Sequence, residues 1–245
     1  MHEDQDNRAG HGNVRPLGRM IALSDAVFAI VLTLLVLDLR PPPAVTDANL
    51  FRGVIAMEPK LVAFATTFAL VAVFWIAHVS MLRRLTAFDW LVAWINLLFL
   101  FTIAVTPFAS TLLGDFSVFG NAWRFYCLVL IAVGAAQTAL LLVIYRGHGR
   151  LVEDVSRREF WHRLTRALSP GLAFAIALAV SLMGFAQVSF LLSWILVPVA
   201  LILARTLLGP KPAPAQIREA AALPTPPTRP SVSVAEAVRA GRDAR

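Results

Sequence analysis

The chain has 245 residues, of which 58% are hydrophobic, and its mean hydropathy is +0.70. Soluble domains are about 45–50% apolar, so this composition excludes an ordinary soluble domain and favours a membrane protein. The formal net charge of +7 comes from arginines and lysines between the apolar segments and near the termini, which indicates membrane orientation rather than nucleic-acid binding.

Six apolar segments follow one another along the chain. We expect an all-α, polytopic membrane protein whose six transmembrane helices lie at 20–39, 61–82, 90–112, 123–145, 167–185 and 188–204. Residues 1–18 then form an N-terminal segment, residues 19–207 the six-helix transmembrane domain, and the proline-rich residues 208–245 a disordered tail.

Several residues mark the expected ends and bends of these helices. Pro170 fits the first turn of the fifth helix, where a missing amide hydrogen costs little. Pro107 lies inside the third segment and predicts a kink. Gln187 and Ser189 mark the expected turn between the last two segments.

The positive charges predict the orientation of the helices. Thirteen arginines and lysines lie on one side of the predicted membrane, whereas the other side has only Arg40, Arg52, Lys60 and Arg124. By the positive-inside rule both termini are cytoplasmic, so we expect a multi-pass protein in the lipid bilayer of the cell's inner (plasma) membrane.

The first helix has an apolar stripe on one face. At about 100° per residue, Ile30, Leu34 and Leu37 share this face and Thr33 lies on its edge. Such a stripe is typical of lipid-facing or core packing as well as of a surface that lines a path through the membrane.

A polar patch lies on a different face of the same helix, at Ser24 and Asp25. A carboxylate in hydrocarbon costs at least about 2.5 kcal/mol, so Asp25 needs partners. His78 and Asn96 fall at a similar depth in the next two helices, and Trp75 shares a face with His78. The spacing predicts a hydrogen-bonded network that joins the first three helices.

Plain alternatives exist for His78 and Trp75, and also for Asp89, which comes just before the third apolar segment. His78 and Trp75 are compatible with positions at the membrane interface, and Asp89 is compatible with a helix N-cap.

Three short motifs carry a resemblance to a known family. The sequence Arg19-x-x-x-Leu23-Ser24-Asp25 resembles the R-x-x-x-F-S-D signature of the potassium channel family named for transmembrane protein 175. The stretch from Phe74 to His78, and Asn96 followed by an apolar run to Pro107-Phe108, are similar to the same family. The resemblance covers about residues 15–115, and the family's motif phenylalanine is replaced by Leu23.

The resemblance implies a potassium-permeable cation channel that carries K⁺ passively, with no resident cofactor or metal. Bacterial members have six helices per subunit and form homotetramers in which the first helix lines the pore. By position, the constriction falls on Ile30, with further apolar rings at Leu34 and Leu37, and Thr33 lies close to it. The resemblance also implies that seven residues organise helix packing around the pore, namely Arg19, Ser24, Asp25, Trp75, His78, Asp89 and Asn96.

Other classes of protein remain open from the residues alone. The main alternative is a proton-coupled secondary transporter that uses Asp25 and His78, although we see no pair of similar three-helix halves. A membrane enzyme lacks a convincing nucleophile or metal-ligand spacing, since His148 and His162 match no metal motif. A purely structural membrane protein is the third possibility.

Overall fold

The computed structural model describes residues 3–40, 45–116, 120–147, 151, 157–193, 195 and 198–199, with side chains from Pro16 onward. The described residues are organised as helices. Their order is α1 (Glu3–Leu37), the 3₁₀-helix η1 (Asp47–Asn49), α2 (Leu50–Ala56), α3 (Glu58–Leu82), α4 (Trp90–Ala104), α5 (Thr106–Asp115), α6 (Asn121–Arg146) and α7 (Arg157–Leu182).

Five helical segments among the described residues are long and apolar enough to cross a membrane. They are Pro16–Leu37, Glu58–Leu82, Trp90–Asp115, Asn121–Arg146 and Glu159–Leu182. These match the first five predicted segments in order. In the described residues, the expectation of an all-α fold with several helices long and apolar enough to span a membrane is therefore confirmed. Of the predicted sixth segment, residues 188–193 continue a helix that begins at residue 186. Most of residues 194–204, and the whole predicted tail at 208–245, lie outside the described residues.

The third predicted segment is divided at Pro107. Helix α4 ends at Ala104, and Pro107 lies in the first turn of α5. Proline has no amide hydrogen to donate, and it disfavours helical geometry in the residue before it. The predicted kink is therefore present as a short break between two helices.

Two predictions about the end of the described chain are wrong. Pro170 lies in the interior of α7, because the polar stretch before the apolar segment is helical as well and α7 begins at Arg157. The turn after α7 is centred on Gly184 rather than on Gln187 and Ser189. Gly184 has a φ of 93°, a left-handed conformation that glycine adopts without a steric penalty.

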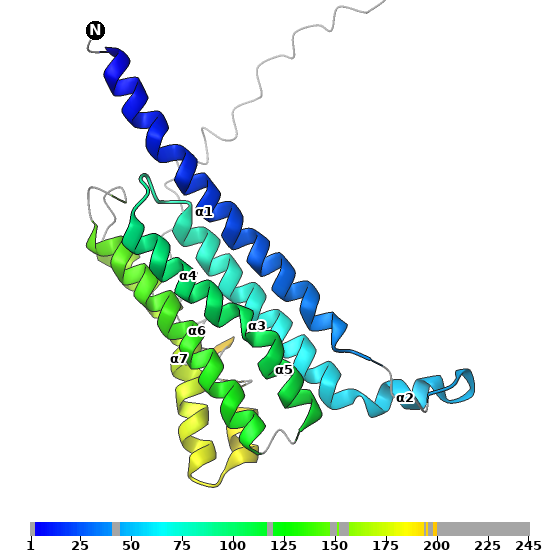
Figure 1. Ribbon diagram of the computed structural model, residues 1–245. Coiled ribbons are helices and arrows are strands. Elements are labelled where there is room, and N and C mark those ends of the chain that lie inside the picture. Colours follow the sequence, from blue (N-terminus) through cyan, green and yellow to red (C-terminus); the bar gives the residue numbers. More distant parts are fainter. Residues whose placement is uncertain are drawn as a thin grey trace, which may run out of the picture. The chain divides into compact units, whose positions relative to one another are not determined.

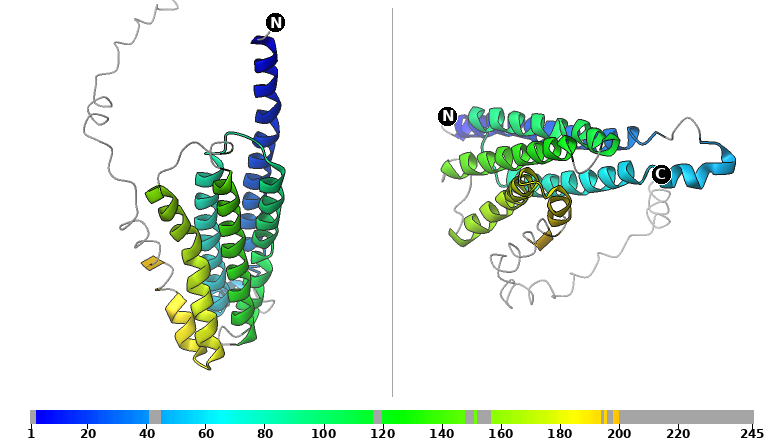
Figure 2. Two further views of the ribbon diagram at one scale, coloured as in Figure 1. Left: turned by 90° about the vertical axis from the view of Figure 1, so that its left-hand side faces the viewer. Right: turned by 90° about the horizontal axis from the view of Figure 1, so that it is seen from below.

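The five long helices run side by side, and α1 extends beyond the others at its N-terminal end (Figures 1 and 2). Helix α6 lies at the centre, because 61% of its most apolar window is buried, against 28–39% for the other four. The C-terminal end of α1 and the N-terminal end of α3 meet at the short helix α2 (Figure 1). We call this end of the bundle the α2 end.

Helices α6 and α7 approach each other closely at two glycines, Gly134 and Gly171. A Cβ atom added to Gly134 would lie 2.8 Å from the Cα atom of Gly171. Real Cβ atoms do not come so close to backbone atoms, so only glycine permits this crossing.

We expect Gly134→Ala to separate α6 from α7 and to lower the free energy of unfolding by about 1–3 kcal/mol, because overpacking a tight contact forces the backbones apart. Thermal unfolding of the detergent-solubilised protein would measure the change. Gly18→Ala is the matched control, since nothing lies within 4 Å of an added Cβ there. Equal melting temperatures for the two variants would contradict the close crossing.

Candidate functional site

Helix α1 is buried along one face only. Its buried side chains are spaced three and four residues apart, at Met20, Ser24, Phe28, Val31 and Leu35. This spacing is that of a single helical stripe, and it packs against α3, α4 and α5. Leu17, Ile21, Val27 and Leu32 are partly buried beside this stripe, and the exposed side chains from Pro16 onward form the outward surface of the helix.

The apolar stripe identified in the sequence lies on this outward surface. Ile30 is 57% exposed, Leu34 is 42% exposed and Leu37 is 62% exposed. Thr33 is also exposed, and its hydroxyl donates a hydrogen bond of 2.8 Å to the backbone oxygen of Ile30. A single subunit therefore leaves the whole stripe uncovered.

Ser24 and Asn96 form a buried hydrogen bond between α1 and α4. The Asn96 side-chain nitrogen Nδ2 donates to Ser24 Oγ at 3.0 Å, and Ser24 Oγ donates to the backbone oxygen of Met20 at 2.9 Å. Ser24 is 1% exposed and Asn96 is fully buried. Breaking this bond would leave polar atoms in an apolar interior, so it holds α1 at a defined rotation about its axis.

Asp25 pairs with Trp75 on a different side of α1. The Trp75 indole nitrogen Nε1 donates a hydrogen bond of 3.0 Å to Asp25 Oδ1. Asp25 is exposed in the single subunit, and Trp75 is 39% exposed. Successive helical residues point about 100° apart, which explains why Ser24 and Asp25 reach different neighbouring helices.

His78 packs as an aromatic ring between α1 and α4. It is fully buried, its ring stacks on Phe99 with the centroids 4.8 Å apart, and the Phe28 ring lies 5.7 Å away. Within the described part of the chain, neither ring nitrogen of His78 has a hydrogen-bond partner. His78 therefore contributes ring contacts there, and no hydrogen bond between described residues joins it to Asp25.

Asp89 and Arg19 take separate positions. Asp89 is the N-cap of α4, where its carboxylate accepts hydrogen bonds from the backbone amides of Leu91 and Val92. Arg19 is exposed on α1. The seven residues of the expected network are thus divided into two hydrogen-bonded pairs, one stacked ring, one helix cap and one exposed cation.

Two polar contacts were missed in the sequence. Thr111 of α5 donates a hydrogen bond of 2.5 Å to Asp38, which follows the last residue of α1, and so ties α1 to the bundle at the α2 end. Gln137 of α6 donates a bond of 3.2 Å to the backbone oxygen of Phe74 in α3. Thr111 and Gln137 are polar residues inside apolar segments. Such positions were the feature of the sequence that could have indicated these contacts.

Metal ligands do not gather in the part of the chain that the structure describes. No group of three or more His, Cys, Asp or Glu side chains there could hold a metal ion.

Residues 19–107 match the sequence model of a family described as endosomal/lysosomal potassium channel TMEM175. A potassium channel of Streptomyces collinus is 31% identical over 127 residues, which are 50% of this chain and 62% of that protein. The match therefore spans less than two thirds of that relative. A potassium channel of Chamaesiphon minutus is 28% identical over 194 residues, which are 76% of this chain and 91% of the relative.

A solved structure has a similar fold. The crystal structure of a lysosomal potassium-selective channel TMEM175 homolog from Chamaesiphon minutus superposes with a TM-score of 0.65 and 22% sequence identity. The superposition covers 78% of this chain and 100% of the other.

We expect the Ser24–Asn96 bond to show a coupling energy of about 1 kcal/mol in a double-mutant cycle of Ser24→Ala and Asn96→Ala, measured by reversible unfolding in detergent. Ser24→Ala combined with Thr165→Ala on α7 is the control cycle, because the Thr165 hydroxyl bonds only within α7 and the two changes should add. A Ser24–Asn96 cycle that is equally additive would show that this bond does not fix α1.

Proposed function

Because residues 19–107 match the TMEM175 family model, we propose that the chain belongs to this family and forms a potassium-permeable cation channel that carries K⁺ passively across the inner (plasma) membrane. In this proposal the sixth helix completes the transmembrane domain, four subunits assemble as a homotetramer, and α1 of each subunit lines a shared axial pore. Both termini face the cytoplasm, as the thirteen positive charges on that side indicate.

The observation that carries the proposal is what α1 leaves exposed in a single subunit. The apolar stripe is exposed on one side of the helix, and the carboxylate of Asp25 is exposed on another. A carboxylate near the centre of a bilayer costs about 2.5–3.5 kcal/mol when lipid surrounds it, so a surface that carries one is expected to face protein or water. Other copies of the chain would provide such a protein or water environment. A single chain with one lining helix cannot enclose a pore alone.

Ile30 is the proposed constriction. Four isoleucine side chains around an axis form a ring that offers a permeating ion no ligand to replace its water. Such a ring controls conduction through its wetting, and it favours K⁺ over Na⁺ because the larger ion loses water at lower cost. Leu34 and Leu37 extend the apolar lining toward the α2 end.

Thr33 is a polar side chain beside this stripe. Its hydroxyl hydrogen is used in the bond to the backbone oxygen of Ile30, whereas the lone pairs of its oxygen stay available. We infer that Thr33 offers a weak oxygen ligand next to the constriction.

The geometry favours a channel over a proton-coupled transporter. A proton relay between Asp25 and His78 needs a hydrogen-bonded path, and in the described residues the His78 ring nitrogens have no such partner. Passive K⁺ flux that is independent of a proton gradient would distinguish the channel from the transporter.

We expect Ile30→Asn to change K⁺ flux from loaded liposomes by about tenfold or to lower the K⁺/Na⁺ ratio, because an amide ring hydrates the constriction. Ile30→Cys should change flux in the same assay and become sensitive to thiol reagents. The control is Ile176→Asn, which alters an isoleucine of similar exposure on α7. Unchanged flux in both Ile30 variants would place the constriction elsewhere.

We expect a homotetramer by light scattering in detergent, and Asp25→Ala should shift the mass toward smaller species or lower the yield. Asp25→Asn keeps an acceptor for the Trp75 indole and should retain more of the assembly. Asp47→Asn, on the exposed 3₁₀-helix η1, is the control. A tetramer of Asp25→Ala with normal stability would refute the role of this carboxylate in assembly.

A further inference from the structure

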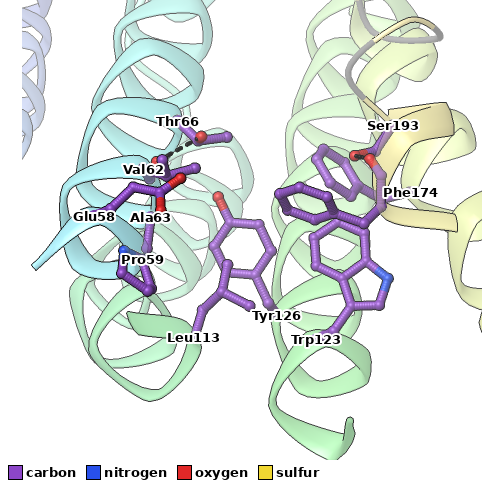
Figure 3. A pocket seen from close by; sticks show the side chains of 11 residues that line it. Glu58, Pro59, Val62, Ala63, Thr66, Leu113, Trp123, Tyr126, Phe174 and Ser193 are labelled. Atoms are coloured by element: carbon purple, nitrogen blue, oxygen red, sulfur yellow. Dashed lines mark hydrogen bonds between the residues drawn. The ribbon is translucent and has the colours of Figure 1, made fainter. Parts of the chain in front are cut away.

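A cavity of about 310 Å³ lies at the α2 end of the bundle, apart from the stripe on α1. Helices α3, α5, α6 and α7 and the helical residues 186–193 each contribute to its wall, whereas α1 contributes nothing. Figure 3 shows Glu58 and Thr66 on the α3 side and the rings of Tyr126, Trp123 and Phe174 on the opposite side. Its volume is at the lower end of the range for small-molecule sites.

Aromatic rings form the wall opposite α3. Trp123 and Tyr126 are stacked with their ring centroids 5.8 Å apart, and Phe190 meets Trp123 edge-on at 5.2 Å. Phe174 meets Tyr126 edge-on at 6.1 Å. These contacts hold four rings in fixed positions around the cavity. Trp123, Tyr126 and Phe174 are at most 2% exposed, whereas Phe190 is partly exposed, so a ligand in the cavity would meet chiefly Phe190. The face of an aromatic ring attracts a cation.

The hydrogen-bond donors of the wall are already used within the protein. The Trp123 indole donates to Ser189 Oγ at 2.8 Å, and the Tyr126 hydroxyl bonds to Thr67 Oγ1 at 3.0 Å. Thr66 and Ser193 donate to backbone oxygens of their own helices. The wall therefore offers little to an anion or to a neutral ligand that needs donors.

Glu58 is the one charged residue among those that line the cavity. Glu58 is exposed, and no hydrogen bond or ion pair joins its carboxylate to another described residue. The ammonium of Lys60, two residues further along α3, pairs with Asp115 at 2.5 Å. Glu58 lies in the first turn of α3, where its negative charge interacts favourably with the helix dipole. This interaction alone does not explain why the carboxylate lines a cavity. A carboxylate facing aromatic rings is complementary to a cation with an apolar body.

We propose that this cavity binds an organic ammonium group, held by the Glu58 carboxylate on one side and by the aromatic rings on the other. Two sources share this chemistry, namely the ammonium headgroup of a lipid and a free organic amine from the aqueous phase at the α2 end. Hydrated K⁺ does not suit the site, because the wall has few oxygen ligands to replace its water.

Calorimetric titration of the full-length protein in an uncharged detergent tests the proposal with choline and its neutral carbon analogue 3,3-dimethyl-1-butanol. We expect choline to bind at least about tenfold more tightly than the analogue. Glu58→Gln should remove this preference, and Phe190→Leu should weaken choline about threefold while leaving the analogue unchanged. Asp47→Asn, which removes a carboxylate outside the cavity, should bind choline as the unaltered protein does.

Equal affinity for choline and the analogue, or unchanged choline binding by Glu58→Gln, would overturn the proposal. Mixed micelles distinguish the two sources: phosphatidylethanolamine competes with choline if a lipid headgroup is the ligand, whereas diacylglycerol, which has no charged headgroup, does not. Absence of competition by either lipid supports a free amine. Since no lining residue belongs to α1, these results do not depend on whether K⁺ passes along the α1 stripe.

Discussion

The buried hydrogen bond between Ser24 and Asn96 is the constraint on which the orientation of α1 depends. In an apolar interior neither group can exchange its partner for water, so a rotation of the helix would strand both. The rings of Phe28, His78 and Phe99 pack one turn further along and favour the same rotation. Because this face is fixed inward, Ile30, Leu34 and Leu37 necessarily point outward.

A second contact, at the C-terminal end of α1, fixes the same orientation further along the helix. Thr111 binds Asp38 just after the last turn, more than three helical turns beyond Ser24. Because α1 is attached to the bundle at both of these points, the part of the helix between them presents its outward surface in one orientation. A rigid surface is what an axial lining requires, since the spacing between four copies then depends on subunit packing and not on bending of single helices.

The proposed pore lining and the proposed ammonium site differ in their cation chemistry. The outward stripe of α1 is made of aliphatic side chains that bind no ion firmly, which suits passage. The cavity at the α2 end combines the Glu58 carboxylate with rings held in place by mutual contacts, which suits retention of an apolar cation. Helix α3 contacts both regions of the molecule. It begins at Glu58, which lines the cavity, and Trp75 near its other end bonds to Asp25 of α1.

The sequence by itself determined the helical class and the first five apolar segments, because the length and apolarity of a segment are local properties. It also determined that Ile30, Leu34 and Leu37 share a face, since helical periodicity requires this. Only the tertiary structure decided how the polar residues pair. Ser24 and Asp25 are neighbours in sequence, but they reach different helices, and His78 meets rings where a hydrogen bond was expected. Depth along the membrane can be read from residue numbers, whereas the direction of a side chain around its axis depends on which helix packs beside it. For the same reason the cavity at Glu58, whose wall comes from distant segments, left no sign in the sequence.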